Sequence, residues 1–490
     1  MLEERQRKPL SEGMDELPDL DLLTVAQKDE LIRMQHGMIV ALSAQVEGLT
    51  AKLKELEGRL ALNSRNSSKP PSSGGYGKHN RAKAKDGADT DKKKSGGQKG
   101  HRGHTLKRSE QPDHVVPCPL PSHCDRCQSP LPEGVVVETR QVFDIPRRPP
   151  VVTEYQLTEA RCGCGKVHRG EFPLGVRAPV QYGPNIKAAV VNLTHHHMIP
   201  VARTGALTGE LFGLQMSDAT VLAIHAEAKV ILTPIVTEIG ETLKTVPIAH
   251  TDETGMHVSG KLHWLHVVAT TLLTWIGCHT KRGRQAIDAF GILTAFVGTL
   301  VHDGWKTYRD LVCTHALCNA HHLRELTFVF EQLGQAWANR LIDLLTDALD
   351  EVKSIGGPLP AERRADYRSR YAEILAEGDT ANPRAPRTGK RGRVKQSKAR
   401  NLLDRLTLYA DDVWRFATDH GVPFSNNVAE QAVRMPKVKE KISGGFRTLT
   451  GLETFCTIRS YLATLQKQGV NTFDALALAF QGTPLQPRFA

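Results

Sequence analysis

Three acidic side chains, far apart along the chain, best suit metal-dependent chemistry. Asp252 ends the apolar run in TVPIAHTDETG, and Asp303 ends the one in GTLVHDGWKTY. Hard divalent cations such as Mg²⁺ or Mn²⁺ favour oxygen ligands, which paired carboxylates supply. Glu430, in SNNVAEQAVRMPKVKEK, is the best third acid. The three would complete a two-metal site, in which one ion activates an attacking water or hydroxyl. The other ion stabilises the leaving oxygen of an in-line phosphoryl transfer.

The helix expected around Glu430 also carries cations. The Asn pair at 426–427 would cap it. Glu430, Arg434 and Lys437 then fall at i, i+4 and i+7 on one helix face. The carboxylate would hold metal while the two cations meet the phosphate of the scissile strand. Pro436 is a potential helix breaker and leaves the placement of Lys437 open. A turn cap or a salt bridge is the alternative explanation for each acid taken singly.

The elements that must position these acids follow from the surrounding apolar runs. Two further strands, KLHWLHVVAT and TLLTWIGCHT, follow the first, and a helical stretch near Gln285–Ala289 precedes the strand before Asp303. Three antiparallel strands, a helix and a parallel strand form the order of an RNase H-like α/β domain, in which Asp252 and Asp303 end neighbouring strands. Glu430 follows Asp303 by 127 residues. We therefore predict that the mostly helical Leu326–His420 is an insertion before the last catalytic helix.

Nine cysteines, mostly in short pairs, favour metal binding in a reducing compartment over a disulfide framework. Between the pairs, VVVETRQVFDIPRR and VVTEYQLTEA alternate like strands. This pattern resembles a zinc ribbon, in which two turns present thiolates to one structural Zn²⁺. Free buried thiols, the alternative, would not explain pairs on both sides of a hairpin. The predicted ligands are Cys124, Cys127, Cys162 and Cys164, and substitute ligands are Cys118, His123 and His168.

Positive charge is concentrated in two segments. The chain has 64 Lys and Arg against 53 Asp and Glu, a net +11, which favours nucleic acid or an anionic surface as partner. Residues 63–108 hold 13 of these cations and three Asp. They are predicted to be a disordered arm on DNA phosphates or a solvated linker. Residues 384–400 hold eight cations and no acid, a second phosphate-contacting segment or a solvated loop. The predicted contacts include Lys92, Lys93, Lys94, Arg102, Arg391 and Arg393.

Two other regions are predicted to be helical. An apolar seam with spacings of three and four favours a dimerising coiled coil over a single amphipathic helix. The seam is Ile39, Leu42, Val46, Leu49, Leu53, Leu56 and Leu60. Tyr182–Thr242, with a turn at Gly213 and a cap at Ser217, fits a helix–turn–helix or a plain helical hairpin. His195–His197 are expected to be structural, because consecutive residues on a helix do not face one another.

No membrane partner is expected. Acidic residues precede any apolar run at the N-terminus, unlike a signal peptide. The longest stretch without charged side chains, Leu262–Thr280, fits two strands better than a membrane span. We therefore expect a cytoplasmic, nucleoid-associated protein.

Several motifs resemble those of the DDE transposases of the insertion-sequence-sixty-six family. The likeness runs from the N-terminal helix nearly to the C-terminus. The motifs are NSSKPPSS at 66–73, GGQKGHRGHTL at 96–106, the cysteine pairs, DETG, HDGW, Cys318-x2-His321 and NNVAEQAVRMPKVKEKISGGFRT through GLETFCTIRSYLATLQKQG. The resemblance implies a retroviral-integrase-like core with Asp252, Asp303 and Glu430 as the DDE triad. It also implies that the family's zinc-finger block falls on the four cysteines above, although CxC departs from the commoner CxxC.

The family implies a DNA transposase of a bacterial insertion sequence. Such an enzyme binds terminal inverted repeats, cleaves the 3′ ends and transfers them to target DNA, using two Mg²⁺ or Mn²⁺ per site. A homodimer or larger assembly on DNA and small accessory proteins of the same element are implied partners. A structure-directed nuclease of the same fold and a transposase-derived DNA-binding regulator are the alternatives. Cys318 and His321 could bind a second zinc or line the active site, but packing at a strand–helix junction is favoured.

The predicted architecture is a multidomain α/β chain with an RNase H-like core and a helical insertion. In order, its parts are a coiled coil (1–62), a disordered basic linker (63–112), a zinc-ribbon DNA-binding domain (113–178), a helical HTH-like region (179–244), the first part of the core (245–325), the insertion (326–420) and the last catalytic helix with the C-terminal helices (421–490).

Overall fold

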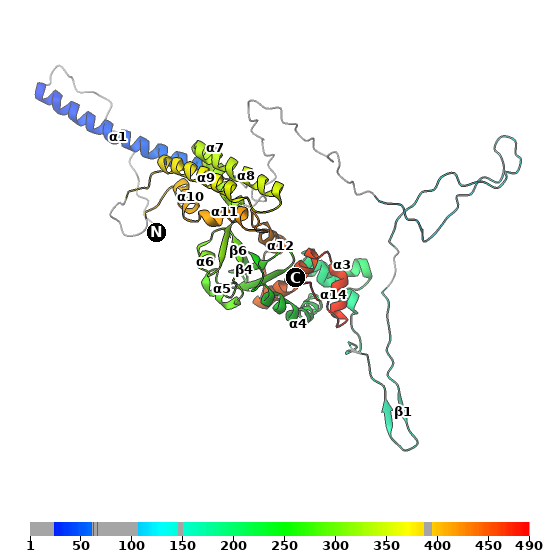
Figure 1. The fold of residues 1–490 in the computed structure, drawn as a ribbon. Helices are drawn as coiled ribbons and strands as arrows, with labels where there is room; N and C mark the ends of the chain where they lie inside the picture. Colours follow the sequence, from blue (N-terminus) through cyan, green and yellow to red (C-terminus); the bar gives the residue numbers. More distant parts are fainter. Residues whose placement is uncertain are drawn as a thin grey trace. The chain divides into compact units, whose positions relative to one another are not determined.

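The computed structural model describes residues 24–60, 62, 66, 106–145, 150–173, 175–386 and 394–489 (Figure 1). The chain forms two compact units. The larger comprises Met1–Tyr76, Gly183–Ile199 and Ile224–Ala490, and the smaller comprises Gly77–Tyr182 and Pro200–Ala223. Six predicted DNA contacts lie outside the described residues: Lys92, Lys93, Lys94, Arg102, Arg391 and Arg393.

A five-stranded mixed sheet is the centre of the larger unit. Its strands are β3 (Ile248–Val258), β4 (Lys261–Ala269), β5 (Thr274–His279), β6 (Thr299–His302) and β7 (Thr314–Leu317). The order is β5-β4-β3-β6-β7. β5, β4 and β3 pair antiparallel, whereas β6 pairs parallel with β3 and β7. Helix α5 (Arg284–Phe290) lies between β5 and β6 in the chain. This arrangement is consistent with the predicted RNase H-like core.

Strand β3 is longer than the sequence predicted. The expectation that Asp252 ends it is wrong, because antiparallel pairing with β4 continues through Val258. Ser259 and Gly260, with φ of 47° and 75°, form the two-residue turn into β4, and such turns favour residues with positive φ. Parallel pairing with β6 stops at His250. Asp252 therefore lies inside β3, just past the point where β6 leaves it.

Helices α12 (Asn427–Ser443) and α13 (Leu449–Lys467) pack against the antiparallel part of the sheet. Strand residues such as Leu265 and Val267 meet Phe455 of α13 in one buried core. Burial of each such side chain contributes about 1.5–3 kcal/mol relative to exposure. This core fixes the strand and the helix that carry two of the predicted acids.

A second group of helices follows β7. They are α7 (Asn319–Leu333), α8 (Ala336–Ile355), α9 (Ala361–Ala381), α10 (Lys398–Leu408) and α11 (Ala410–Thr418). Their buried core includes Leu341, Leu403 and Trp414. α11 packs against β7, the edge strand of the sheet. The segment predicted to be an insertion is therefore mostly helical where the structure describes it.

The N-terminal seam lies on one long helix, α1 (Val25–Leu60), drawn in blue in Figure 1. All seven predicted seam residues are exposed, by 53–86%. Beyond the helix, Leu62 packs against the core of the second helical group. The seam is therefore available to another helix.

The region predicted to be helical contains α2 (Pro184–Val191), the π-helix η3 (Asn192–His196), α3 (Val201–Phe212) and α4 (Asp218–Thr242). As predicted, Gly213 ends α3 in the left-handed conformation, with φ 68°. Ser217 Oγ accepts the N–H of Thr220 at 3.2 Å, as a capping side chain does. In the larger unit, α14 (Thr472–Phe480) packs against α2.

Among the described helices, α4 alone has the length and apolar composition of a membrane span. One such helix is weak evidence, because core helices pass the same test. Leu232 and Ile239 of α4 are fully buried, as expected of a core helix.

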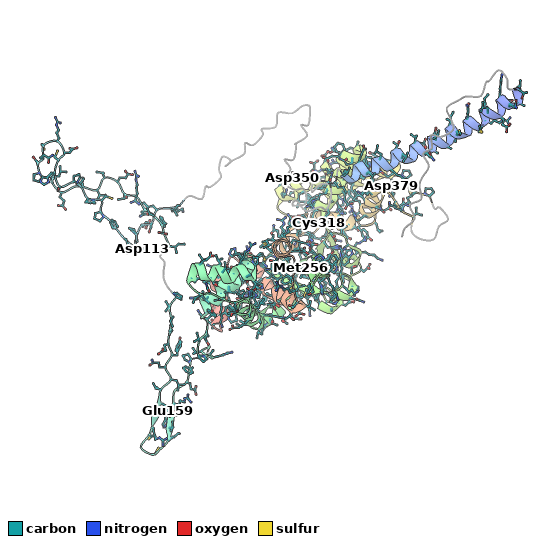
Figure 2. The ribbon with its side chains drawn as sticks, turned by 180° about the vertical axis from the view of Figure 1, so that it is seen from behind. Asp113, Glu159, Met256, Cys318, Asp350 and Asp379 are labelled. Carbon is teal, nitrogen blue, oxygen red and sulfur yellow. The ribbon has the colours of Figure 1, made fainter. Side chains whose placement is uncertain are left out.

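The cysteine-bearing segment contains one short hairpin, β1 (Glu159–Arg161) with β2 (Val167–Arg169), marked by Glu159 in Figure 2. The prediction of strands at 135–145 and 151–158 is wrong, since these residues form none. Val135 to Val137 are 84–92% exposed. The physical reason is that the apolar side chains of this segment stay exposed, and without a second layer to bury them a two-stranded ribbon gains too little to fix its register.

Candidate active site

The structure brings two of the predicted acids to adjacent strands. Parallel pairing of β3 with β6 matches Ile248 with Thr299 and His250 with Val301. Asp252 follows His250 by two residues, and Asp303 follows Val301 by two residues. The same register therefore leads to both acids, where the two strands diverge.

Glu430 joins this pair from the first turn of α12. The pKa of Asp252 is raised to about 8, first by burial and then by the negative charges of Glu253, Asp303 and Glu430, while the N–H of Glu253 opposes the shift. Asp303 and Glu430 are thus near enough to Asp252 for their charges to disfavour its ionised form.

The Asp303 carboxylate is held by the turn that follows β6. Its Oδ1 accepts the N–H of Trp305 at 2.8 Å. Gly304 has φ 88°, a conformation that favours glycine. The HDGW motif thus combines the acid, the turn and the donor that orients it.

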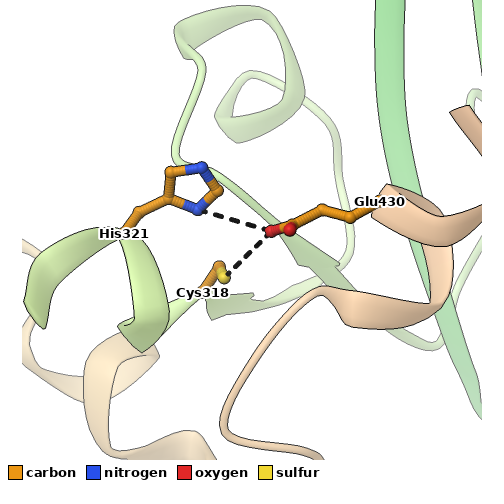
Figure 3. A group of neighbouring side chains, drawn as sticks. All are labelled: Cys318, His321 and Glu430. Atoms are coloured by element: carbon orange, nitrogen blue, oxygen red, sulfur yellow. Dashed lines mark hydrogen bonds and ion pairs between the residues drawn. The ribbon is translucent and has the colours of Figure 1, made fainter. Parts of the chain in front are cut away.

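Cys318 and His321 both point toward the Glu430 carboxylate (Figure 3). The Cys318 thiol donates to Glu430 Oε1 at 3.9 Å. The His321 Nδ1 lies 3.8 Å from the same oxygen. Burial raises the pKa of the Cys318 thiol to about 11, so the thiol is protonated at neutral pH. The pair sits at the β7–α7 junction, as the favoured interpretation held, and also lines the site.

Asn426 ties the strand of Asp252 to the helix of Glu430. Its Nδ2 donates to Thr251 O at 2.8 Å, and its Oδ1 lies 3.1 Å from His250 Nδ1. Its backbone N–H donates to Cys318 Sγ at 3.1 Å. The predicted capping role is wrong for its side chain, which makes no cap hydrogen bond, because the amide is used by β3. Sequence reasoning identified this residue only through its position before a helix.

An ion pair between the buried Glu253 carboxylate and the partly exposed Arg282 lies beside the acids, and the sequence analysis did not predict it. Arg282 Nε donates to Glu253 Oε1 at 2.9 Å, and Tyr308 OH donates to Glu253 Oε2. The Arg282 guanidinium lies 4.9 Å from the ring centre of Trp264 and 4.5 Å from that of Trp305. The adjacent acids in DETG were the available signal, since one of two neighbouring acids on a strand faces away from the other.

The two cations predicted beside Glu430 differ in their contacts. Pro436 does not break α12, which continues through it to Ser443, so Lys437 keeps its helical position. Its Nζ donates to Gly255 O at 2.7 Å and to Glu440 at 2.8 Å. Arg434 is exposed. Phosphate contact by either residue stays a prediction.

The acids fit hard divalent metal. Among the described residues, no basic side chain forms an ion pair with Asp252 or Asp303, although Asp252 is mostly buried. Buried carboxylates without counter-charge are costly, and a divalent cation supplies the missing charge through oxygen ligands. Mg²⁺ or Mn²⁺ matches this donor set.

The zinc-ribbon cysteines form two local pairs. Hydrogen bonds, from Ser129 first and also from Cys124, lower the pKa of the Cys127 thiol. Hydrogen bonds within the turn, from Cys164, lower that of Cys162. Within the described part of the chain, no cluster of three potential metal ligands includes these cysteines. Each pair has the turn that zinc binding needs, while the meeting of the two pairs stays a prediction.

Comparison with known families gives two matches. The model of the family described as "Transposase IS66 family" matches residues 179–454, more than half of the chain. A second, described as a "Family of unknown function", matches residues 16–107. No curated protein matches the chain. The first match contains all three acids, Cys318 and His321, and leaves out the predicted zinc ligands.

Proposed function

Because the chain belongs to the IS66 transposase family, a family of DDE enzymes, we propose that it cleaves the ends of a mobile DNA element and joins the freed 3′ ends to target DNA. Asp252, Asp303 and Glu430 form its acid triad. The convergence of the three acids carries the proposal: the β3–β6 register leads to both Asp252 and Asp303, and Glu430 of α12 is near enough for its charge to act on Asp252. Three half-buried acids from separate elements otherwise have no reason to converge on one place.

Two divalent ions held by the triad would supply Lewis-acid activation of the attacking oxygen and stabilisation of the leaving oxygen. Asp252 and Asp303 present their carboxylates from neighbouring strands, and Glu430 closes the site from α12. In the first step, water attacks the scissile phosphorus and the bond to the 3′ oxygen breaks, leaving a 3′-hydroxyl. In the second, that hydroxyl attacks a target phosphorus and displaces its 3′ oxygen. No covalent protein–DNA intermediate is needed.

DNA would be held by cations outside the triad. Arg434 is exposed four residues after Glu430, on the same helix face. The basic arm, the segment at 384–400 and the zinc ribbon would grip the terminal repeats, and α1 would pair protomers so that two ends are held together. Binding to chromosomal DNA would place the protein at the nucleoid.

Replacing Asp252 by Asn tests the triad. The change removes a negative oxygen ligand and keeps the side-chain shape, so metal-dependent cleavage of end-bearing DNA is abolished while binding of those ends is nearly unchanged. Thermal stability is maintained, because the variant no longer buries an ionisable group. Asp288→Asn, at an exposed position of α5, is the matched control and cleaves normally. Cleavage by Asp252→Asn at the control rate would contradict the assignment.

The alternatives separate in two assays. A nuclease of the same fold cleaves but does not join pre-cut ends to a supercoiled plasmid, whereas a transposase joins them. A DNA-binding regulator binds ends without any metal-dependent cleavage. Products with element ends joined to plasmid DNA support the proposed function.

A further inference from the structure

A mixed set of ligand atoms surrounds the Glu430 carboxylate. Cys318 is the single residue between β7 and α7, and His321 lies in the first turn of α7. Figure 3 shows both side chains facing the Glu430 carboxylate. The sulfur, one imidazole nitrogen and one carboxylate oxygen all lie within 4.8 Å of one another. Of all the described residues, only these form such a group of three. Two sequence-distant segments, α7 and α12, create it together.

The donor types differ from those of the acid triad. One thiol, one imidazole and one carboxylate suit zinc-class transition metals, whereas Mg²⁺ prefers oxygen alone. Ligand atoms around a tetrahedral zinc ion lie roughly 3.3–3.6 Å apart, given bonds of about 2.0–2.3 Å. The observed separations from Glu430 Oε1 are 3.9 Å to Cys318 Sγ and 3.8 Å to His321 Nδ1. Small side-chain rotations would close that difference.

Two features of this cluster favour metal binding over simple packing. His321 Nδ1 is buried and makes no hydrogen bond to any described residue. An unmade hydrogen bond of this kind costs about 1–3 kcal/mol, which coordination would recover. Cys318 Sγ already accepts the Asn426 N–H at 3.1 Å, the kind of outer contact that supports a bound thiolate. Metal binding would displace the thiol proton.

We propose that Cys318, His321 and Glu430 bind one zinc-class transition-metal ion, with a coordination position left open for water. The binding itself does not depend on the proposed function. Its consequence does: an ion held here engages Glu430 and withdraws that carboxylate from the Mg²⁺ site. Zinc bound at this cluster would then inhibit Mg²⁺-dependent cleavage by the enzyme.

Cobalt binding to the full-length, metal-stripped protein tests the site. Co²⁺ bound to a thiolate gives a charge-transfer absorption, so a titration counts the sites. The wild type binds one more Co²⁺ than Cys318→Ser and one more than His321→Ala. Cys313→Ser, a half-buried cysteine outside the cluster, binds as much as the wild type. Equal stoichiometry in the wild type, Cys318→Ser and His321→Ala would overturn the proposal.

Glu430→Gln examines the shared ligand. Loss of the charged oxygen weakens Co²⁺ binding at this site at least about tenfold, and unchanged affinity would show that the ion does not engage Glu430. Cys318 is buried and its variant could misfold, whereas the side chains of His321 and Glu430 are 21% and 19% exposed. Their variants are therefore the decisive pair, with thermal unfolding as the check on folding. The Co²⁺ titrations contain no DNA. Loss of the Co²⁺ site and loss of DNA cleavage are therefore independent results, and one can occur without the other.

Discussion

At the scale of single residues, Asn426 shows how a polar side chain can hold a site together without being a ligand. It is 2% exposed and contacts Thr251, His250 and Cys318 at once. Burial lowers the pKa of His250 to about 4, against the opposing effect of Asn426, so the imidazole is neutral and donates to the amide oxygen. Asp252 and Glu430 thereby keep one relative position.

Asn426→Ala leaves a buried carbonyl and a buried imidazole without partners. We expect it to lower the free energy of unfolding by about 2–6 kcal/mol, at about 1–3 kcal/mol for each of the two orphaned groups. Urea denaturation measures the loss. Asn427→Ala, one residue further on and exposed, should change stability by less than about 0.5 kcal/mol. Equal values for the two variants would argue against this role.

At the scale of elements, α13 completes the edge of the sheet. β5 is an edge strand, and such edges leave backbone groups unpaired. Ser460 Oγ accepts the N–H of Ile276 at 2.8 Å, and Thr464 Oγ1 accepts that of Thr274 at 2.9 Å. Lys467 Nζ donates to two carbonyls of the β4–β5 turn. Helix side chains thus replace a missing neighbouring strand.

Lys467 gives the stability of the protein a defined pH dependence. Burial lowers its pKa from 10.5 to about 8. Between these values the unfolded chain holds a proton that the folded chain has lost, so stability rises with pH across this window. Relative to Lys467→Met, the wild type should gain up to about 3 kcal/mol between pH 8 and pH 10.5. Denaturation at several pH values measures this, and parallel profiles would contradict it.

The cysteine segment is the element that most needs an ion. Its hairpin is exposed, so a zinc ion joining both pairs would supply the stability that an apolar core does not. Chelation of zinc, or Cys124→Ser, should weaken end binding before it affects cleavage within the core. Filter binding and a cleavage assay on the same samples compare the two. Unaffected binding by zinc-free protein would remove the ribbon from DNA recognition.

At the scale of the whole molecule, α1 presents an apolar stripe that a second copy would cover. Its leucines are exposed along the entire heptad seam, and such stripes mark interaction surfaces. A two-ended DNA substrate gives pairing a purpose, since each protomer would hold one end.

Leu49→Glu places a charge in this seam and should convert dimers to monomers in sedimentation velocity, because the partner helix would have to bury it. Ala44→Glu, on the face of the same helix opposite the seam, adds the same charge and should leave the dimer intact. A monomeric wild type, or a dimeric Leu49→Glu, would rule out the coiled coil.

The sequence alone predicted four of the five strands of the sheet and the helical character of the regions around it, and it proposed three acids, because these depend on local apolar periodicity and short motifs. It did not predict β7. It misplaced the end of β3 and predicted strands around the cysteines. Both errors concern pairing, which depends on the partner available and not on the segment itself.

Only the tertiary structure decided which distant groups meet. Cys318 and His321, at the start of α7, meet Glu430 of α12, more than a hundred residues further along the chain. The side-chain amide of Asn426 hydrogen-bonds to β3 and not to its own helix. Arg282 is tied to the acid site by its ion pair with Glu253, the neighbour of Asp252 in the chain. No spacing in the chain encodes such contacts, because side-chain hydrogen bonds and shared burial arise only when packed elements fix the distance between them.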